Sequence, residues 1–75
     1  MAFKNDDPCR DKAGDDEPIF TLRAQDESAP TAVRCWANVA RLLGAPAEKW
    51  LAAEHVARDM EVWQSKNSDR VKVPD

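Results

Sequence analysis

Two tryptophans, Trp36 and Trp63, lie on apolar stripes with helical spacing, and these stripes are wider than one helical hairpin can bury. The chain has only 75 residues, so it forms one domain at most, and domains of this size bury a low fraction of their surface. Two cysteines and one histidine offer little stabilisation by disulfides or zinc. We therefore expect two copies of the chain to associate as a homodimer.

Composition divides the chain into three parts. Residues 1–17 are acidic and polar, which predicts a disordered arm. Residues 18–65 hold the periodic patterns and predict a single dimerisation domain, whereas residues 66–75 predict a flexible tail. No apolar run resembles a signal peptide or approaches the roughly 20 residues that span a bilayer. These features predict a soluble cytoplasmic protein that does not bind membranes.

Apolar and polar residues alternate over residues 18–24, with Phe20 and Leu22 on one face, and this periodicity is typical of a strand. A strand needs a backbone partner, and residues 71–73 offer only a short one. We expect antiparallel pairing of residues 18–24 with the same segment of a second copy. The predicted fold is therefore α+β and mostly α, with a short N-terminal strand followed by two helices.

The first helix is expected to begin near Ala29, where the Ser28 hydroxyl can cap it and Pro30 is tolerated in the first turn. Its predicted core face carries residues at three- and four-residue steps: Ala32, Val33, Trp36, Val39, Ala40 and Leu43. The opposite side carries Arg34, Ala37, Asn38 and Arg41. We expect Trp36 to be a core residue.

Gly44 predicts the end of this helix, and a second helix is expected over residues 46–65, antiparallel to the first. Its main apolar stripe comprises Ala53, Val56, Ala57, Met60 and Trp63, and a smaller stripe comprises Leu51, His55 and Val62. Two stripes on one helix indicate two contacts, one of them outside the chain. The predicted dimer interface comprises Phe20, Leu22, Val56, Met60 and Trp63.

The sequence contains no catalytic, metal or cofactor motif. His55 and Asp59 are spaced to form an acid–base pair on one helix face, but no nucleophile has a matching position, so we interpret His55 as partly buried or interfacial. With two glycines in the chain, no phosphate-binding loop is present. We interpret the two cysteines as unpaired thiols. The predicted function is binding without catalysis.

The predicted partner-binding residues are Arg34, Asn38, Arg41 and Trp50, because they combine basic charge with the tryptophan that we expect to be most exposed. An alternative is a small DNA-binding regulator that uses the first helix through Arg34, Asn38 and Arg41. Residues 46–65 argue against it, since they carry two basic residues against four acidic ones.

The run E-P-I-F-T-L-R-A-Q-D at residues 17–26, followed by Ala29, Pro30, Val33 and Trp36, resembles small uncharacterised proteins encoded by bacteriophages and prophages. The resemblance covers about half of the chain and carries no catalytic residues. It implies an accessory protein that binds and modulates a host or phage protein in the host cytoplasm. Inhibitors of host defence, such as anti-CRISPR proteins, are one class of this kind.

Overall fold

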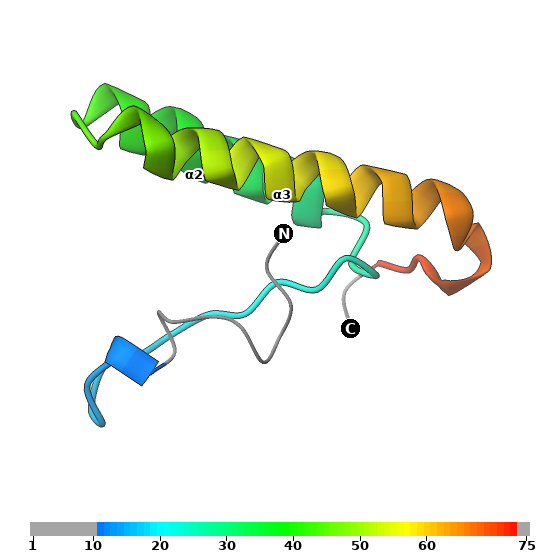
Figure 1. Ribbon diagram of the computed structural model, residues 1–75. Coiled ribbons are helices and arrows are strands. Elements are labelled where there is room, and N and C mark those ends of the chain that lie inside the picture. The colour runs from blue at the N-terminus through cyan, green and yellow to red at the C-terminus, as the bar shows by residue number, and fades with distance from the viewer. Residues whose placement is uncertain (1–10, 74–75) are drawn as a thin grey trace.

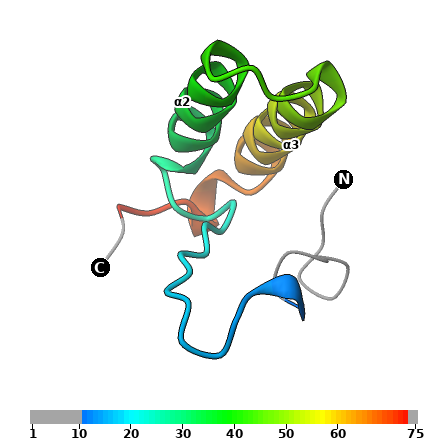
Figure 2. The ribbon, with the colours of Figure 1, turned by 90° about the vertical axis from the view of Figure 1, so that its left-hand side faces the viewer.

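The computed structural model describes residues 11–73. Helices α2 (Ala29–Leu42) and α3 (Ala47–Lys66) lie side by side and antiparallel, joined by a four-residue turn (Figures 1 and 2). A short 3-10 helix, η1 (Ser68–Arg70), follows α3. The predicted helical hairpin is confirmed. Residues 1–10 and 74–75, which include much of the predicted arm and the end of the predicted tail, lie outside the described residues.

The predicted N-terminal strand is wrong, because residues 18–24 form no strand and the described part of the chain contains no sheet. The predicted α+β class is corrected to a two-helix hairpin. The one β-type pairing among the described residues is a single parallel bridge between Asp26 and Lys72. In it, the Glu27 N–H donates to the Lys72 carbonyl and the Lys72 N–H donates to the Gln25 carbonyl, both at 2.9 Å. Alternation alone does not make a strand when no segment pairs along its length.

Local hydrogen bonds explain both ends of α2. The Ala29 N–H donates to the Asp26 carbonyl at 2.9 Å, and the Ser28 side chain makes no cap hydrogen bond, contrary to the prediction. At the other end Gly44 has a φ of +90°, as its predicted capping role requires. The Gly44 N–H donates to the Arg41 carbonyl and the Ala45 N–H to the Ala40 carbonyl, which is the Schellman pattern of a helix C-terminus.

The C-terminal end of α3 holds the two flanking segments against the hairpin. Gln64 donates through Nε2 to the carbonyls of Ala24 at 2.9 Å and Asp26 at 3.0 Å. Asn67 donates through Nδ2 to the Trp63 carbonyl at 2.9 Å, and the Arg70 guanidinium lies 4.8 Å from the Trp63 ring centre. The chain therefore returns after α3 toward the segment that precedes α2.

The buried apolar residues of the hairpin are all small. Ala29 and Ala37 of α2 and Ala57 of α3 are fully buried, with Pro30 beside them, and no large side chain of the described residues is fully buried. Small side chains allow two helix backbones to approach closely. The helices thus pack through alanine.

The predicted core face of α2 is wrong in its rotation about the helix axis. Trp36, Val39 and Leu43 were expected to be core residues and are exposed, whereas Ala37 was expected on the polar side and is buried. Val33 and Ala40 remain half-buried at the margin of the packed face. The prediction selected the face of α2 with the largest side chains. The face that packs carries small side chains instead, because it lies against Ala57 of α3.

Candidate interaction surface

Four large apolar side chains of the α2 region are exposed, and we call this group the α2 surface. Trp36 is 58%, Val39 52%, Leu42 69% and Leu43 82% exposed. At 3.6 residues per turn, positions 36, 39, 42 and 43 lie on one side of the helix. Single exposed apolar residues are ordinary, but here three lie on one side of a 14-residue helix and the fourth, Leu43, is its C-cap residue, so together they form one patch.

The charged side chains of α2 lie on the other side of this helix. Arg34 donates to both carboxylate oxygens of Glu61 on α3, from Nη1 to Oε2 at 2.7 Å and from Nη2 to Oε1 at 2.6 Å. Arg41 donates through Nη2 to Asn38 Oδ1 at 2.8 Å. The α2 surface therefore contains no charged group of its own helix.

The ion pair between Arg34 and Glu61 perturbs both groups. The hydrogen bond from Arg34 lowers the pKa of Glu61 below its usual range, and the same bond raises the pKa of the Arg34 guanidinium. Both side chains are exposed, so the pair is screened by solvent. The ion pair joins α2 to α3 at one edge of the interface between the two helices.

The opposite edge of the helix pair is apolar. Trp36 follows Arg34 by two residues, which is about 200° around the helix, and Met60 precedes Glu61 by about 100°. Helical spacing therefore places Trp36 and Met60 on the side away from the ion pair, with Val56 one turn along from Met60. Val56, Met60 and Trp63 are half-buried. The α2 surface thus continues toward these residues of α3.

A second, smaller apolar stripe lies on the back of α3. Leu51 is 43% and Val62 45% exposed, and His55 is exposed between them. Leu51 and Val62 face away from Ala57 and the contact with α2, as helical spacing requires. His55 and Asp59, though both described, form no hydrogen bond with each other. This stripe provides a comparison surface of similar chemistry and smaller size.

Of the predicted dimer residues, Val56, Met60 and Trp63 share one edge of α3, whereas Phe20 and Leu22 lie apart from them. Phe20 is 86% exposed and Leu22 half-buried, on a segment that runs away from the hairpin (Figure 1). Trp50 was expected to be the most exposed tryptophan but is half-buried. The most exposed of the three tryptophans is Trp36.

The α2 surface as a unit was missed by the sequence analysis, although a signal for it existed. Ala29, Val33, Ala37 and Ala40 form a stripe of small residues that could have identified the packed side of the helix. Cys35 adjoins this surface and is a free, exposed thiol. Cys9 lies outside the described residues.

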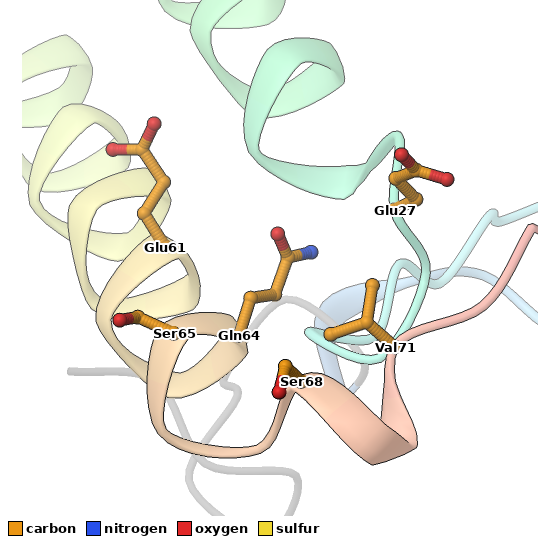
Figure 3. Close-up of a pocket in the computed structure, with 6 residues that line it drawn as sticks. All are labelled: Glu27, Glu61, Gln64, Ser65, Ser68 and Val71. Carbon is orange, nitrogen blue, oxygen red and sulfur yellow. The ribbon is translucent and has the colours of Figure 1, made fainter.

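A shallow depression near the end of α3 is lined by Glu27, Glu61, Gln64, Ser65, Ser68 and Val71 (Figure 3). Two of its polar groups already have partners, because Glu61 binds Arg34 and Gln64 binds two backbone carbonyls. Within residues 11–73 no group of three potential metal ligands occurs, and no helix has the length and apolar character to span a membrane. The depression is therefore a poor candidate for chemistry.

Comparison of the chain with protein-family profiles, with curated proteins and with solved structures finds no match.

Proposed function

We propose that this chain acts by binding another protein through the α2 surface and not by catalysis. The observation that carries the proposal is the exposure of Trp36, Val39, Leu42 and Leu43 on one side of the α2 region. Large contiguous apolar patches on soluble proteins mark interaction sites, and tryptophan is enriched among the residues that dominate binding energy.

The resemblance to small phage-encoded proteins indicates which kind of protein is bound. A host or phage protein is the target that this resemblance implies, with the bound protein modulated stoichiometrically in the host cytoplasm. Inhibition of a host defence system is the most specific form of this proposal. An uncharged, apolar surface suits a protein partner, because such a partner can offer a matching apolar patch.

DNA binding through Arg34, Asn38 and Arg41 has less support. The Arg34 guanidinium is held by the Glu61 carboxylate, and a carboxylate beside an arginine opposes the approach of a phosphate. Arg41 is engaged with Asn38. No arrangement among the described residues favours nucleic acid over protein.

The test uses two matched substitutions that each put a carboxylate on an exposed apolar helix position. Val39→Asp changes the α2 surface, and Leu51→Asp changes the back of α3. Each immobilised protein is exposed to nuclease-treated bacterial lysate, and the retained proteins are identified by mass spectrometry. We expect a discrete protein on the wild type and on Leu51→Asp, and its loss on Val39→Asp.

Two results would count against this function. If the wild type and both variants retained the same lysate protein equally, the binding site would lie outside the α2 surface. Retention that occurs only without nuclease, and that falls steeply with added salt, would indicate nucleic acid.

A further inference from the structure

We propose that residues 18–22 bind a protein partner by adding as a strand to the exposed edge of that partner's β-sheet. In the chain by itself this segment forms no strand. The site lies before α2, so it is separate from the α2 surface and does not depend on which protein that surface binds. In strand addition the backbone hydrogen bonds supply affinity, and alternate side chains supply specificity.

The first observation concerns the backbone of residues 18–22, which makes no hydrogen bond within residues 11–73. A closed turn precedes the segment, since the Glu17 N–H donates to the Gly14 carbonyl at 3.0 Å. Another closed turn follows it, since the Asp26 N–H donates to the Arg23 carbonyl at 3.0 Å. Water satisfies the exposed groups between these turns in the free chain. A second strand is the protein structure that pairs such a row along its length.

The side chains of the segment suit a strand. Ile19 and Thr21 are β-branched and Phe20 is aromatic, and these residue types are enriched in strands. Ile19 is 57% and Phe20 86% exposed, so neither side chain is used in packing the hairpin. Neighbours in an extended chain point to opposite faces, which puts Phe20 on the same face as Leu22. Phe20 is therefore the side chain that an apolar pocket on the partner's sheet would hold.

The position of the segment leaves it accessible. It runs away from the two helices without coiling (Figures 1 and 2). Just beyond it, Gln64 binds the carbonyls of Ala24 and Asp26, and Asp26 bridges to Lys72. An extended segment fixed at its base loses less freedom on binding than a free peptide does. Its five residues would span about 17 Å as a strand, which is an ordinary strand length.

A sheet in another protein suits the segment better than a second copy does. Two copies of residues 18–22 would make a ribbon of two strands, and such a ribbon is marginal unless further strands or a helix cover it. The helices of this chain lie away from the segment in Figure 1 and do not cover it. The sheet of another protein already has its remaining strands and its own core.

The charges beside the segment indicate which kind of edge it fits. Asp15, Asp16 and Glu17 come directly before it, and residues 18–22 are uncharged. Exposed edge strands in natural proteins commonly carry lysine, which opposes edge-to-edge aggregation. A run of carboxylates complements such an edge. The partner is therefore a protein whose sheet has a basic edge strand and an apolar position for Phe20.

The first experiment compares three variants that each put a carboxylate on an exposed apolar position. Phe20→Asp changes the segment, Val39→Asp the α2 surface and Leu51→Asp the back of α3. Each full chain is immobilised and exposed to nuclease-treated bacterial lysate, and a retained protein is identified by mass spectrometry and purified. We expect Phe20→Asp to weaken binding of that purified protein by at least about tenfold, and Leu51→Asp to leave it unchanged.

Structural controls accompany these variants. Phe20 lies outside the hairpin and is 86% exposed, so Phe20→Asp should keep the helical circular dichroism of the wild type. Light scattering on the free chain should give the monomer mass of 8.4 kDa if residues 18–22 have no partner in a second copy.

The second experiment measures hydrogen exchange of single amides by NMR, in the free chain and in its complex with the purified protein. An added strand directs the N–H groups of alternate residues toward its neighbour. We expect slowed exchange at either Ile19 and Thr21 or Phe20 and Leu22, with the other two amides still fast. Docking through side chains alone protects none of the four amides in this pattern.

Each outcome decides the inference. Weaker binding by Phe20→Asp together with alternating protection supports it. Equal binding by the wild type and Phe20→Asp overturns it, and so does the absence of any retained protein. Binding that depends on Phe20 without alternating protection also overturns it. Alternating protection in a free chain of twice 8.4 kDa assigns the segment to a second copy and overturns it too.

The same variants separate this inference from the proposed function. Binding that Val39→Asp abolishes and Phe20→Asp preserves overturns the inference alone. Binding that Phe20→Asp abolishes and Val39→Asp preserves overturns the proposed function alone. Loss in both variants, with alternating protection in the wild-type complex, supports both and shows that one protein contacts the segment and the α2 surface.

Discussion

The two sides of α2 differ in side-chain size, and the smaller residues form the contact within the chain. The inner side places Ala29 and Ala37 against α3, where Ala57 is also fully buried. The outer side exposes Trp36, Val39 and Leu43. Closing the hairpin thus uses close backbone approach, and it leaves the side chains with the largest apolar area for something outside the chain. Apolar area in a helix therefore does not by itself identify the face that packs within the chain.

The largest expected loss of stability comes from a substitution on the inner, buried side of α2. Ala37→Asp places a carboxylate in a fully buried position without a partner, which costs at least about 3 kcal/mol and is enough to unfold a marginal domain. Val39→Asp introduces the same charged side chain two residues away on the outer side. Circular dichroism should show loss of helix for Ala37→Asp and its retention for Val39→Asp. Equal loss of helix in both variants would contradict the assignment of the two sides.

An intermediate effect is expected where the flanking segments meet α3. Gln64→Ala removes both hydrogen bonds to the Ala24 and Asp26 carbonyls, and the Asp26 carbonyl keeps the hydrogen bond from the Ala29 N–H. We expect a loss of about 1–2 kcal/mol in unfolding free energy and faster hydrogen exchange at the Glu27 and Lys72 amides. These amides report the bridge directly, because both donate within it.

The neighbouring change Ser65→Ala is the control for Gln64→Ala. Ser65 is exposed on the next position of the same helix. We expect it to leave hydrogen exchange at the bridge unchanged. Unchanged exchange in Gln64→Ala as well would show that the flanking segments are held to the hairpin by other contacts.

The smallest effect concerns the polar edge of the helix pair. Because Arg34 lowers the pKa of Glu61, their pair stabilises the fold above the usual carboxyl pKa, and this contribution is lost as pH falls through the lowered pKa. Arg34 has a raised pKa and stays protonated throughout. Glu61→Gln should lower the melting temperature slightly at neutral pH.

A pH and salt series checks the Glu61→Gln prediction. The difference in melting temperature between wild type and Glu61→Gln should shrink in acid and at high salt, since both protonation and screening weaken an exposed pair. A difference that persists at acid pH would show that Glu61 contributes through packing of its side chain and not through its charge.

Much of the local structure could be predicted from the sequence. The bounds of α2 and α3 lie within one residue of those expected, and Gly44 adopts the left-handed conformation assigned to it. These features depend on backbone angles and hydrogen bonds between residues close in the chain. Ser28 is an exception, because the Asp26 carbonyl accepts the Ala29 N–H at this helix start.

Two features were not predicted, because each depends on contacts with a distant segment. The rotation of α2 about its axis is decided by Ala57 and Glu61 of α3, which select the small residues and Arg34 for the interface. Residues 18–24 form no strand, and the one β-type pairing among the described residues lies after them, between Asp26 and Lys72. The sequence by itself determined where the helices begin and end, because those interactions are local. Only the tertiary structure decided which side of α2 is buried and which is left exposed, because that choice depends on the shape of the helix it meets.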